Sequence, residues 1–166
     1  MMDGRIWVDS EPGKGSTFHF HARLGLQKEP APRRMFRADE LAGVRLLVVD
    51  DNATAREILS TMASTFGLEV DTASGGEQAL EMISAAEGAA SPYDLVLMDW
   101  KMPKMDGIDC VRHMQDKRLS KVPSIIMVTA YGREEALASA QDQGVSLKSV
   151  LSKPVHASML LEAVGE

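Results

Sequence analysis

Short apolar runs recur along most of the chain, and polar or charged residues follow them. In the run at residues 44–49 the apolar residues do not alternate with polar ones, so this run suits a strand covered on both faces, as in a parallel sheet. Glycine, proline or polar residues bound the runs, as they usually bound strands. The sequence therefore predicts five strands, at residues 44–49, 68–73, 93–98, 124–129 and 147–152.

The intervals between these runs have apolar residues at helical spacing. In the first interval Ala55, Leu59 and Met62 follow this spacing, Asn52 is a candidate cap, and Gly67 ends the pattern. Four further helices are predicted, one beginning at Ser74 or Gly75 and the others at residues 108–117, 133–143 and 157–164. Five strands alternating with five helices predict an α/β fold, a doubly wound five-stranded parallel sheet with helices on both faces.

The first 26 residues follow a different pattern, in which apolar and polar residues alternate. Ile6 and Val8 alternate with polar residues before a Pro-Gly-Lys-Gly turn, and Phe18 and Phe20 do so after it. Alternation with a period of two on both sides of a turn predicts a β-hairpin. We therefore expect an N-terminal hairpin extension in residues 1–26.

A linker is expected between the hairpin and the main domain. Residues 27–42 contain Pro30, Pro32 and many charged residues, without a periodic apolar pattern. The main domain is then residues 43–166. The acidic surplus of the chain belongs to this domain, because the first forty residues are nearly balanced in charge.

Composition and charge exclude several classes of protein. The 166 residues carry a net charge of −6, which argues against a nucleic-acid partner bound by a general basic field. The single cysteine, Cys110, excludes an internal disulfide and a cysteine-based zinc site. The sequence has neither an apolar run long enough to span a membrane nor a cleavable signal pattern, so we expect a cytoplasmic chain without membrane contact.

Polar side chains follow the ends of four predicted strands. Asp50 and Asp51 end the first, Asp99 the third, Thr129 the fourth and Lys153 the fifth. In such sheets functional groups meet at the carboxyl ends of the strands. Three close carboxylates repel one another unless a cation joins them, and hard oxygen ligands suit Mg²⁺. With a lysine to neutralise remaining charge, the set is suited to handling a phosphoryl group.

Four segments containing these residues resemble the response-regulator receiver domains of two-component signalling. The segments are Leu47–Asn52, Leu95–Gly107, Met127–Tyr131 and Leu151–Pro154. The resemblance covers about residues 43–164 and implies the sheet order 2-1-3-4-5. It also implies a Mg²⁺-dependent transfer of a phosphoryl group from a phosphohistidine, and its relay to a histidine phosphotransfer protein or domain.

The resemblance implies a nucleophile and a metal site. Asp99 is the implied phosphoacceptor, which would form an acyl phosphate. Asp50 and Asp51 are the implied Mg²⁺ ligands, with Asp99 and the backbone carbonyl of Lys101 completing the set.

The resemblance also implies a phosphoryl pocket. Lys153 would offset charge on the transferring oxygens, and Thr129 would offer its hydroxyl to one of them. Ala130 is small enough to leave room for the group. Pro154 implies a cis peptide bond after Lys153, and Gly107 is expected to let the loop after Asp99 turn tightly.

Three positions depart from the family pattern or vary within the family. An aromatic residue is common three residues before the lysine, but Val150 is there in this chain. An aromatic switch is therefore in doubt, and coupling to Thr129 is expected to act by packing alone. Lys101 and Tyr131 occupy the positions that modulate self-dephosphorylation in the family. Because Tyr131 is bulky enough to hinder an attacking water, we predict slow hydrolysis.

Residues 4–24 resemble the final β-hairpin of a histidine-kinase ATPase domain. This second resemblance implies that the chain comes from a hybrid histidine kinase, which could be anchored in a membrane. The chain itself would have no kinase activity, only phosphoacceptance and slow self-dephosphorylation, and its phosphodonor would be the kinase phosphoacceptor domain of the same parent. The apolar face of the hairpin is expected to pair with another chain, giving a dimer, or with the receiver surface.

Two alternative functions stay open. The first is a non-phosphorylated pseudo-receiver that acts as a protein interaction module. The sequence argues against it, because the residues expected at the five positions of the phosphorylation site are all present: Asp50, Asp51, Asp99, Thr129 and Lys153. The second is a Mg²⁺-dependent phosphatase with an aspartate nucleophile. Those enzymes have a general acid two residues after the nucleophile, and Lys101, which is at that position here, cannot serve as a carboxyl acid. Trp100 is expected at the rim of the site, where its fluorescence would report binding.

Overall fold

The computed structural model describes residues 3–23, 41–117 and 119–165. It divides into two units, Met1–Arg34 and Met35–Glu166, and each is described by itself. The larger unit contains the five-stranded sheet and the smaller one a two-stranded sheet. Within the described ranges, no helix is both long enough and apolar enough to cross a bilayer.

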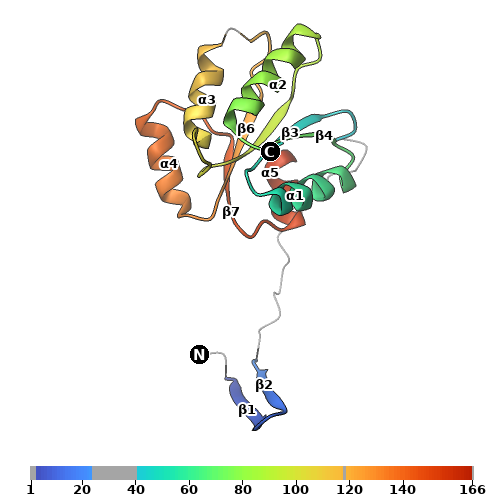
Figure 1. Ribbon diagram of the computed structural model, residues 1–166, viewed down its shortest axis with the longest axis vertical. Helices are drawn as coiled ribbons and strands as arrows, with labels where there is room; N and C mark the ends of the chain where they lie inside the picture. The colour runs from blue at the N-terminus through green and yellow to red at the C-terminus, as the bar shows by residue number, and fades with distance from the viewer. Residues whose placement is uncertain (1–2, 24–40, 118, 166) are drawn as a thin grey trace. The chain divides into compact units, whose positions relative to one another are not determined.

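Five parallel strands form the sheet of the larger unit (Figure 1). They are β3 (Arg45–Val49), β4 (Glu69–Ala73), β5 (Leu95–Asp99), β6 (Ser124–Thr129) and β7 (Ser149–Ser152). Their order is β4-β3-β5-β6-β7, so the predicted α/β fold and the order 2-1-3-4-5 are confirmed. The strand ends lie within two residues of the predicted ones, a difference that is usual for element boundaries.

Five helices cover the two faces of the sheet. They are α1 (Ala53–Thr65), α2 (Gly76–Gly88), α3 (Gly107–Asp116), α4 (Arg133–Asp142) and α5 (Ala157–Gly165). Leu47 and Val49 of β3 pack in one core with α2, α3 and α4, whereas Leu46 and Val48 pack in the other with α1 and α5. Because both faces of the strand are buried, its sequence has no polar alternation.

Side-chain caps fix the start of two helices that lead away from the site. The Oδ1 atom of Asn52 accepts a hydrogen bond from the backbone amide of Ala55 at 3.0 Å, as its predicted capping role requires. The Oδ1 atom of Asp106 accepts one from the amide of Asp109 at 2.9 Å at the start of α3. Gly75 precedes α2, which is one of the two predicted starts.

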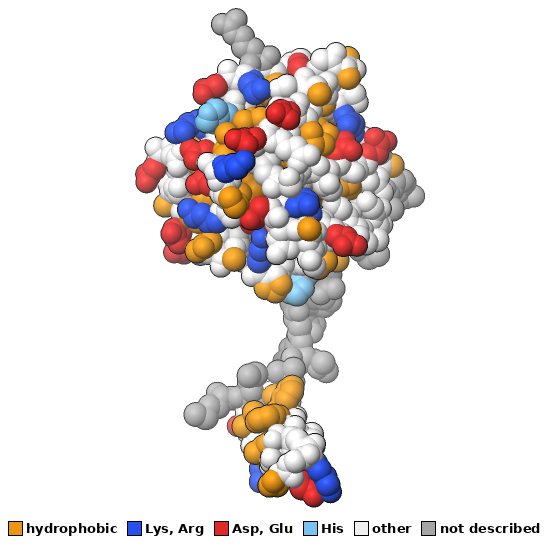
Figure 2. Space-filling model, in the orientation of Figure 1, with side chains coloured by type: hydrophobic (Ala, Val, Ile, Leu, Met, Phe, Trp, Pro, Cys, Tyr) orange, Lys and Arg blue, Asp and Glu red, His pale blue; other side chains and the backbone are white. Residues whose placement is uncertain are grey.

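The smaller unit is an antiparallel hairpin of β1 (Arg5–Glu11) and β2 (Gly15–His21), as predicted. The register pairs Ile6 with Phe20 and Val8 with Phe18. All four side chains are at least half exposed, and Figure 2 shows hydrophobic side chains on the surface of the hairpin. Period-two alternation has therefore produced an apolar face that the described residues of this unit leave uncovered.

The opposite face of the hairpin is polar and aromatic. The rings of Trp7 and His19 stack with their centroids 5.0 Å apart, and Nε2 of His19 lies 3.1 Å from Oδ2 of Asp9. Of the predicted linker, residues 27–42, only residues 41 and 42 are among those that the structure describes. Leu24, which the predicted hairpin included, is also outside the described residues.

Candidate functional site

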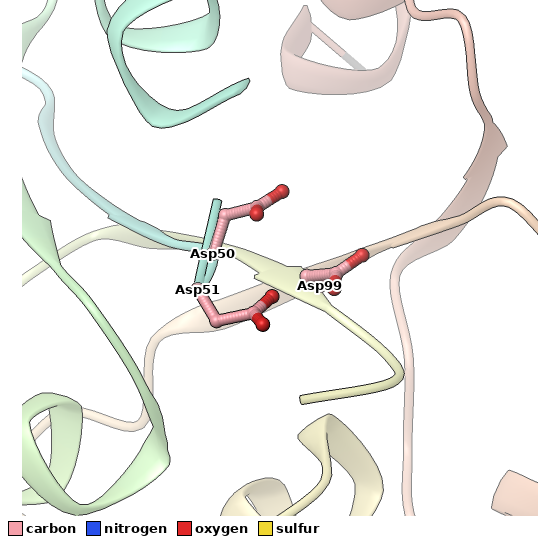
Figure 3. A group of neighbouring side chains, drawn as sticks. All are labelled: Asp50, Asp51 and Asp99. Atoms are coloured by element: carbon pink, nitrogen blue, oxygen red, sulfur yellow. The ribbon is translucent and has the colours of Figure 1, made fainter. Parts of the chain in front are cut away.

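Three carboxylates meet at the carboxyl ends of two neighbouring strands. Asp50 and Asp51 directly follow β3, and Asp99 is the last residue of β5, which pairs with β3 in parallel. One oxygen from each carboxylate lies within 4.8 Å of the others (Figure 3). Asp50 and Asp99 are buried, whereas Asp51 is exposed. The structure thus brings together the three carboxylates that the sequence placed at strand ends.

The backbone around Asp50 holds its carboxylate in place. Its Oδ1 atom accepts a hydrogen bond from the backbone amide of Asn52 at 2.8 Å. Its backbone carbonyl accepts one from Nη1 of Arg56 at 2.6 Å. Arg56 was not identified from the sequence, because a single arginine six residues from an aspartate has no distinctive pattern.

Lys153 reaches this cluster from the end of β7, two strands away from β5. Its Nζ atom lies 2.8 Å from Oδ2 of Asp50 and 2.8 Å from Oδ1 of Asp99. Its backbone amide donates to the carbonyl of Thr129 at 2.7 Å, and the Lys153–Pro154 peptide bond is cis, as the family resemblance implied. One ammonium therefore neutralises part of the charge of three carboxylates.

Burial and hydrogen bonding shift the pKa values of this pair. Burial opposes the charge on Lys153, but hydrogen bonds and attraction to Asp50 and Asp99 outweigh it and raise the pKa of the ammonium. Burial raises the pKa of Asp99, and repulsion from Asp50 and Asp51 adds to this, against the opposing hydrogen bond and attraction from Lys153. Lys153 therefore keeps its proton at neutral pH.

Thr129 lies beside the cluster at the end of β6 and is buried. Its Oγ1 atom accepts a hydrogen bond from the backbone amide of Tyr131 at 2.9 Å, which leaves its own proton for another acceptor. Ala130 is exposed between them. The assignments of Ala130 to a phosphoryl pocket and of the Lys101 carbonyl to a metal stay predictions.

Trp100 does not lie at an exposed rim, contrary to the expectation. Its side chain is 2% exposed and belongs to the core on the α2-α3-α4 face. Lys101, the next residue in the chain, and Tyr131, in the loop after β6, are the exposed side chains in this region. A large apolar ring next to a buried strand end gains more from burial than from contact with water, and the sequence alone did not show on which side of the sheet it would lie.

Gly107 closes the loop after Asp99 for a steric reason. A Cβ atom at this position would lie 2.3 Å from the backbone oxygen of Asp99 and 2.8 Å from Cγ of Met98. The amide of Gly107 also donates to the carbonyl of Trp100 at 2.7 Å. The close approach of the two backbone segments therefore requires glycine at this position. Gly107 does not have a positive φ angle, so the requirement is steric and does not come from a left-handed backbone conformation.

The donor set fits a hard divalent cation. Three carboxylates with one ammonium leave uncompensated negative charge, and carboxylate oxygens are the ligands that Mg²⁺ prefers. Asp50, Asp51 and Asp99 are the residues that would hold it.

The family model described as "Response regulator receiver domain" matches residues 46–165. The sensor protein TorS of Escherichia coli is 28% identical over 96% of this chain, and the autoinducer 2 sensor kinase/phosphatase LuxQ of Vibrio cholerae is 30% identical over 99% of it. The chain spans only 16% and 19% of the lengths of these two relatives.

Solved structures of receiver domains share the fold. The chemotaxis protein CheY4 of Vibrio cholerae has a TM-score of 0.65 and 27% identity, over 75% of this chain and 98% of its own. A variant of the receiver domain of the histidine kinase CKI1 of Arabidopsis thaliana has a TM-score of 0.63 and 28% identity, over 78% and 95%. CheY of Borrelia burgdorferi, solved with CheX, BeF₃ and Mg²⁺, has a TM-score of 0.62 and 27% identity, over 81% and 96%.

Proposed function

The chain belongs to the response regulator receiver domain family, and from this premise we propose that Asp99 accepts a phosphoryl group in a phosphorelay. One observation supports the proposal above all others. The carboxylate of Asp99 lies within hydrogen-bonding distance of the Lys153 ammonium and within 4.8 Å of two further carboxylates that suit Mg²⁺. A nucleophile, a cation and a set of hard oxygen ligands are the parts that phosphoryl transfer requires.

In the proposed reaction, a carboxylate oxygen of Asp99 attacks the phosphorus of a phosphohistidine. The new oxygen–phosphorus bond forms as the nitrogen–phosphorus bond breaks, and the electron pair of that bond returns to the imidazole. Lys153 carries its proton at neutral pH, so its charge can offset the charge on the transferring oxygens. Thr129 has a hydroxyl proton to donate to one of these oxygens.

Mg²⁺ is the proposed cofactor. When bound by Asp50, Asp51, Asp99 and the backbone carbonyl of Lys101, it would supply Lewis-acid stabilisation of the phosphoryl oxygens. The Borrelia burgdorferi relative was solved with BeF₃ and Mg²⁺, which supports this assignment by analogy.

The proposed donor and acceptor of the phosphoryl group are histidine side chains on other domains. The kinase phosphoacceptor domain, in the same parent chain, would phosphorylate Asp99, and a histidine phosphotransfer protein or domain would receive the group. The match of a named sensor kinase/phosphatase along 99% of this chain supports a parent of the hybrid kinase type. On this proposal the domain acts in the cytoplasm, whether or not the parent is anchored in a membrane.

The hairpin has a separate proposed origin. Residues 4–24 would be the end of the ATPase domain of the same kinase, with residues 27–42 as the linker to the receiver. The relatives that match along almost the whole chain support this division. The exposed Phe18 and Phe20 support the proposal that another chain covers the apolar face.

Intact mass measurement tests the phosphoacceptor assignment. Incubation with Mg²⁺ and a small phosphodonor should add about 80 Da, the mass of one phosphoryl unit. Asp99→Asn should abolish the shift, whereas the matched control Asp106→Asn should retain it, since asparagine also caps helices. A wild-type chain without the shift would instead favour the non-phosphorylated interaction module, and an Asp99→Asn chain that keeps the shift would contradict the assignment of Asp99 as the phosphoacceptor.

A further inference from the structure

Every polar group of Asp50 has a partner, and the partners come from different parts of the domain. Its backbone amide donates to the carbonyl of Ala73 in β4 at 3.2 Å. Its Oδ1 atom accepts from the amide of Asn52, and its Oδ2 atom accepts from Nζ of Lys153, both at 2.8 Å. Its backbone carbonyl accepts from Nη1 of Arg56, in α1, at 2.6 Å. Asp50 is therefore fixed through both its backbone and its side chain.

Asp51, the next residue, is held much less firmly. Its side chain is exposed, and the described residues give its carboxylate neither a hydrogen bond nor an ion pair. The carboxylate nevertheless lies in the cluster with those of Asp50 and Asp99, and Figure 3 shows it on the same side of the chain as that of Asp50. The direction of the Asp51 side chain is therefore set mainly by the backbone that carries it.

The peptide group between Asp50 and Asp51 connects Arg56 to this backbone. The carbonyl of Asp50 and the amide of Asp51 belong to one planar unit, so a hydrogen bond that fixes the direction of the carbonyl also fixes the plane. This unit leads directly into Cα of Asp51, from which the side chain departs. If the contact with Arg56 is lost, the peptide group can rotate and the Asp51 carboxylate moves with it.

The geometry of α1 explains why Arg56 supplies this hydrogen bond. The amide of Arg56 donates to the carbonyl of the capping residue Asn52 at 3.0 Å, so the carbonyl of Asp50 precedes the hydrogen-bond ladder of the helix. Side chains of a helix lean toward its N-terminus, so the guanidinium reaches back past the cap. Because the donor is charged, this hydrogen bond is stronger than one between neutral groups.

Helix stability does not explain an arginine at this position. A positive charge near the N-terminus of a helix opposes the helix dipole, and α1 has no acidic residue in its first turn to offset it. A methionine has a similar helix propensity and would avoid this cost. Attraction to Asp50 and Asp51 compensates for part of the cost, but a general attraction does not require a hydrogen bond to a backbone carbonyl.

We propose that Arg56 is a positioning residue for the metal site, which holds the peptide group between Asp50 and Asp51 so that the Asp51 carboxylate points at the cation. The inference rests on the proposed function, because it concerns the binding of Mg²⁺ by these carboxylates. In this role Arg56 acts through the backbone and is not itself a ligand of the cation.

Two roles of Arg56 predict opposite effects on the binding of Mg²⁺. If the guanidinium acted only through its charge, it would repel the cation, and its removal would strengthen binding. If it positions Asp51, its removal displaces a ligand and weakens binding. The sign of the change in the dissociation constant therefore distinguishes positioning from a general effect of charge.

Titration with Mg²⁺ alone, followed through the backbone amide resonances in NMR spectra, measures this constant without phosphorylation. Arg56→Met should raise it about 10-fold, at the low end of the range for residues that orient metal ligands. Arg56→Lys should recover part of the affinity, because an ammonium also donates to a carbonyl. The matched control is Arg112→Met on α3, where Arg112 is exposed and contacts Asp109 and Gln143, and it should leave the constant unchanged. An Arg56→Met constant equal to or below that of the wild type would overturn the proposal.

A double-variant cycle tests whether Asp51 is the residue that Arg56 positions. Asp51→Asn should weaken Mg²⁺ binding in the wild-type background but add little in the Arg56→Met background, where Asp51 is already displaced. Effects that simply multiply would contradict the proposed connection between the two residues.

The dependence of the phosphorylation rate on Mg²⁺ separates positioning from a purely structural role. Arg56→Met should raise the half-saturating concentration of Mg²⁺ about 10-fold and leave the rate at saturating Mg²⁺ nearly unchanged. A general defect of the fold would lower the saturated rate and leave the half-saturating concentration as it is, and that result would refute the positioning role.

The metal-free chain provides a readout that remains if Arg56→Met does not fold. Arg56→Lys and Arg56→Gln should each move the amide resonance of Asp51, whereas Arg112→Met should not. If both Arg56 variants leave this resonance unchanged, Arg56 does not hold the peptide group and the inference fails alone. A wild-type chain whose Asp50 and Asp51 resonances do not respond to Mg²⁺ would instead refute the proposed cofactor, and the inference with it.

Discussion

Gly107→Ala should damage both the stability of the receiver domain and the position of its nucleophile. The added methyl carbon would lie 2.3 Å from the backbone oxygen of Asp99. A carbon–oxygen contact needs about 3.3 Å, so the two groups must separate by about 1 Å. Neither can yield easily, because Asp99 ends a central strand and Gly107 begins α3.

The magnitude follows from these distances. Overpacking of a dense interior costs about 1–3 kcal/mol, and the rigid backbone oxygen suggests about 2 kcal/mol for this site. The adjacent side chains of Met98 and Met127 can adjust, so they add little. A displacement of about 1 Å at a reacting group can reduce the rate about a hundredfold, so phosphorylation of Asp99 should slow by tenfold or more.

Urea denaturation and the rate of mass gain with a phosphodonor measure the two effects. The matched control is Gly88→Ala at the end of α2, where a Cβ atom meets nothing within 4 Å. That variant should gain up to about 1 kcal/mol, because alanine is the better helix former, and should react at the wild-type rate. If Gly107→Ala matched Gly88→Ala in both measurements, the steric reasoning would be refuted.

Three further predictions concern other parts of the chain. Burial would raise the pKa of Asp94, but the hydrogen bonds that its carboxylate accepts from the Lys121 ammonium and the Arg45 amide outweigh burial and hold the pKa below its ordinary value. Asp94→Asn should therefore cost about 1 kcal/mol at pH 7, and the difference should vanish in urea titrations as the pH falls through that lowered pKa; an equal loss at every pH would contradict this. Lys104 has a φ of 68°, so Lys104→Gly should gain about 0.5 kcal/mol while Lys104→Ala gains none, as compared by thermal unfolding. Phe18 is 72% exposed on the hairpin, so Phe18→Ser should abolish a self-association that wild-type chains show in sedimentation, and a monomeric wild type would exclude the dimer.

The sequence predicted the sheet well because its three central strands, β3, β5 and β6, are buried on both faces. A continuous apolar run such as Leu46–Val49 indicates a central parallel strand, because its side chains must be buried on both faces of the sheet. Right-handed crossover connections then limit the possible orders of the strands. The same reasoning placed Asp50, Asp51 and Asp99 at one edge. Their closeness is a property of neighbouring parallel strands, so the acidic cluster could be found without coordinates.

Side-chain directions beyond the strand ends could not be read in this way. Trp100 was expected at the rim but is buried, because the pattern of the strand does not say which way the residue after it turns. Gly107 was expected to let the loop after Asp99 turn tightly, but the sequence did not show the reason, which is a close approach to the backbone oxygen of Asp99. Arg56 gave no sequence signal, since its contact is with a backbone carbonyl that any residue would offer.

The sequence by itself determined the α/β class, the carboxylates at the strand ends and the apolar stripe of the hairpin, because all three follow from periodicity along the chain, whereas the strand order was implied by the family resemblance. The tertiary structure decided which groups touch: the shared contacts of Lys153 with Asp50 and Asp99, and the packing of Lys101 and Tyr131 on Trp100. Lys153 and Asp50 are 103 residues apart, and no local pattern encodes a distance between such residues. That distance depends on how β7 and β3 are placed in the sheet and on the path of the loop after β7, and these are set by the packing of the whole domain.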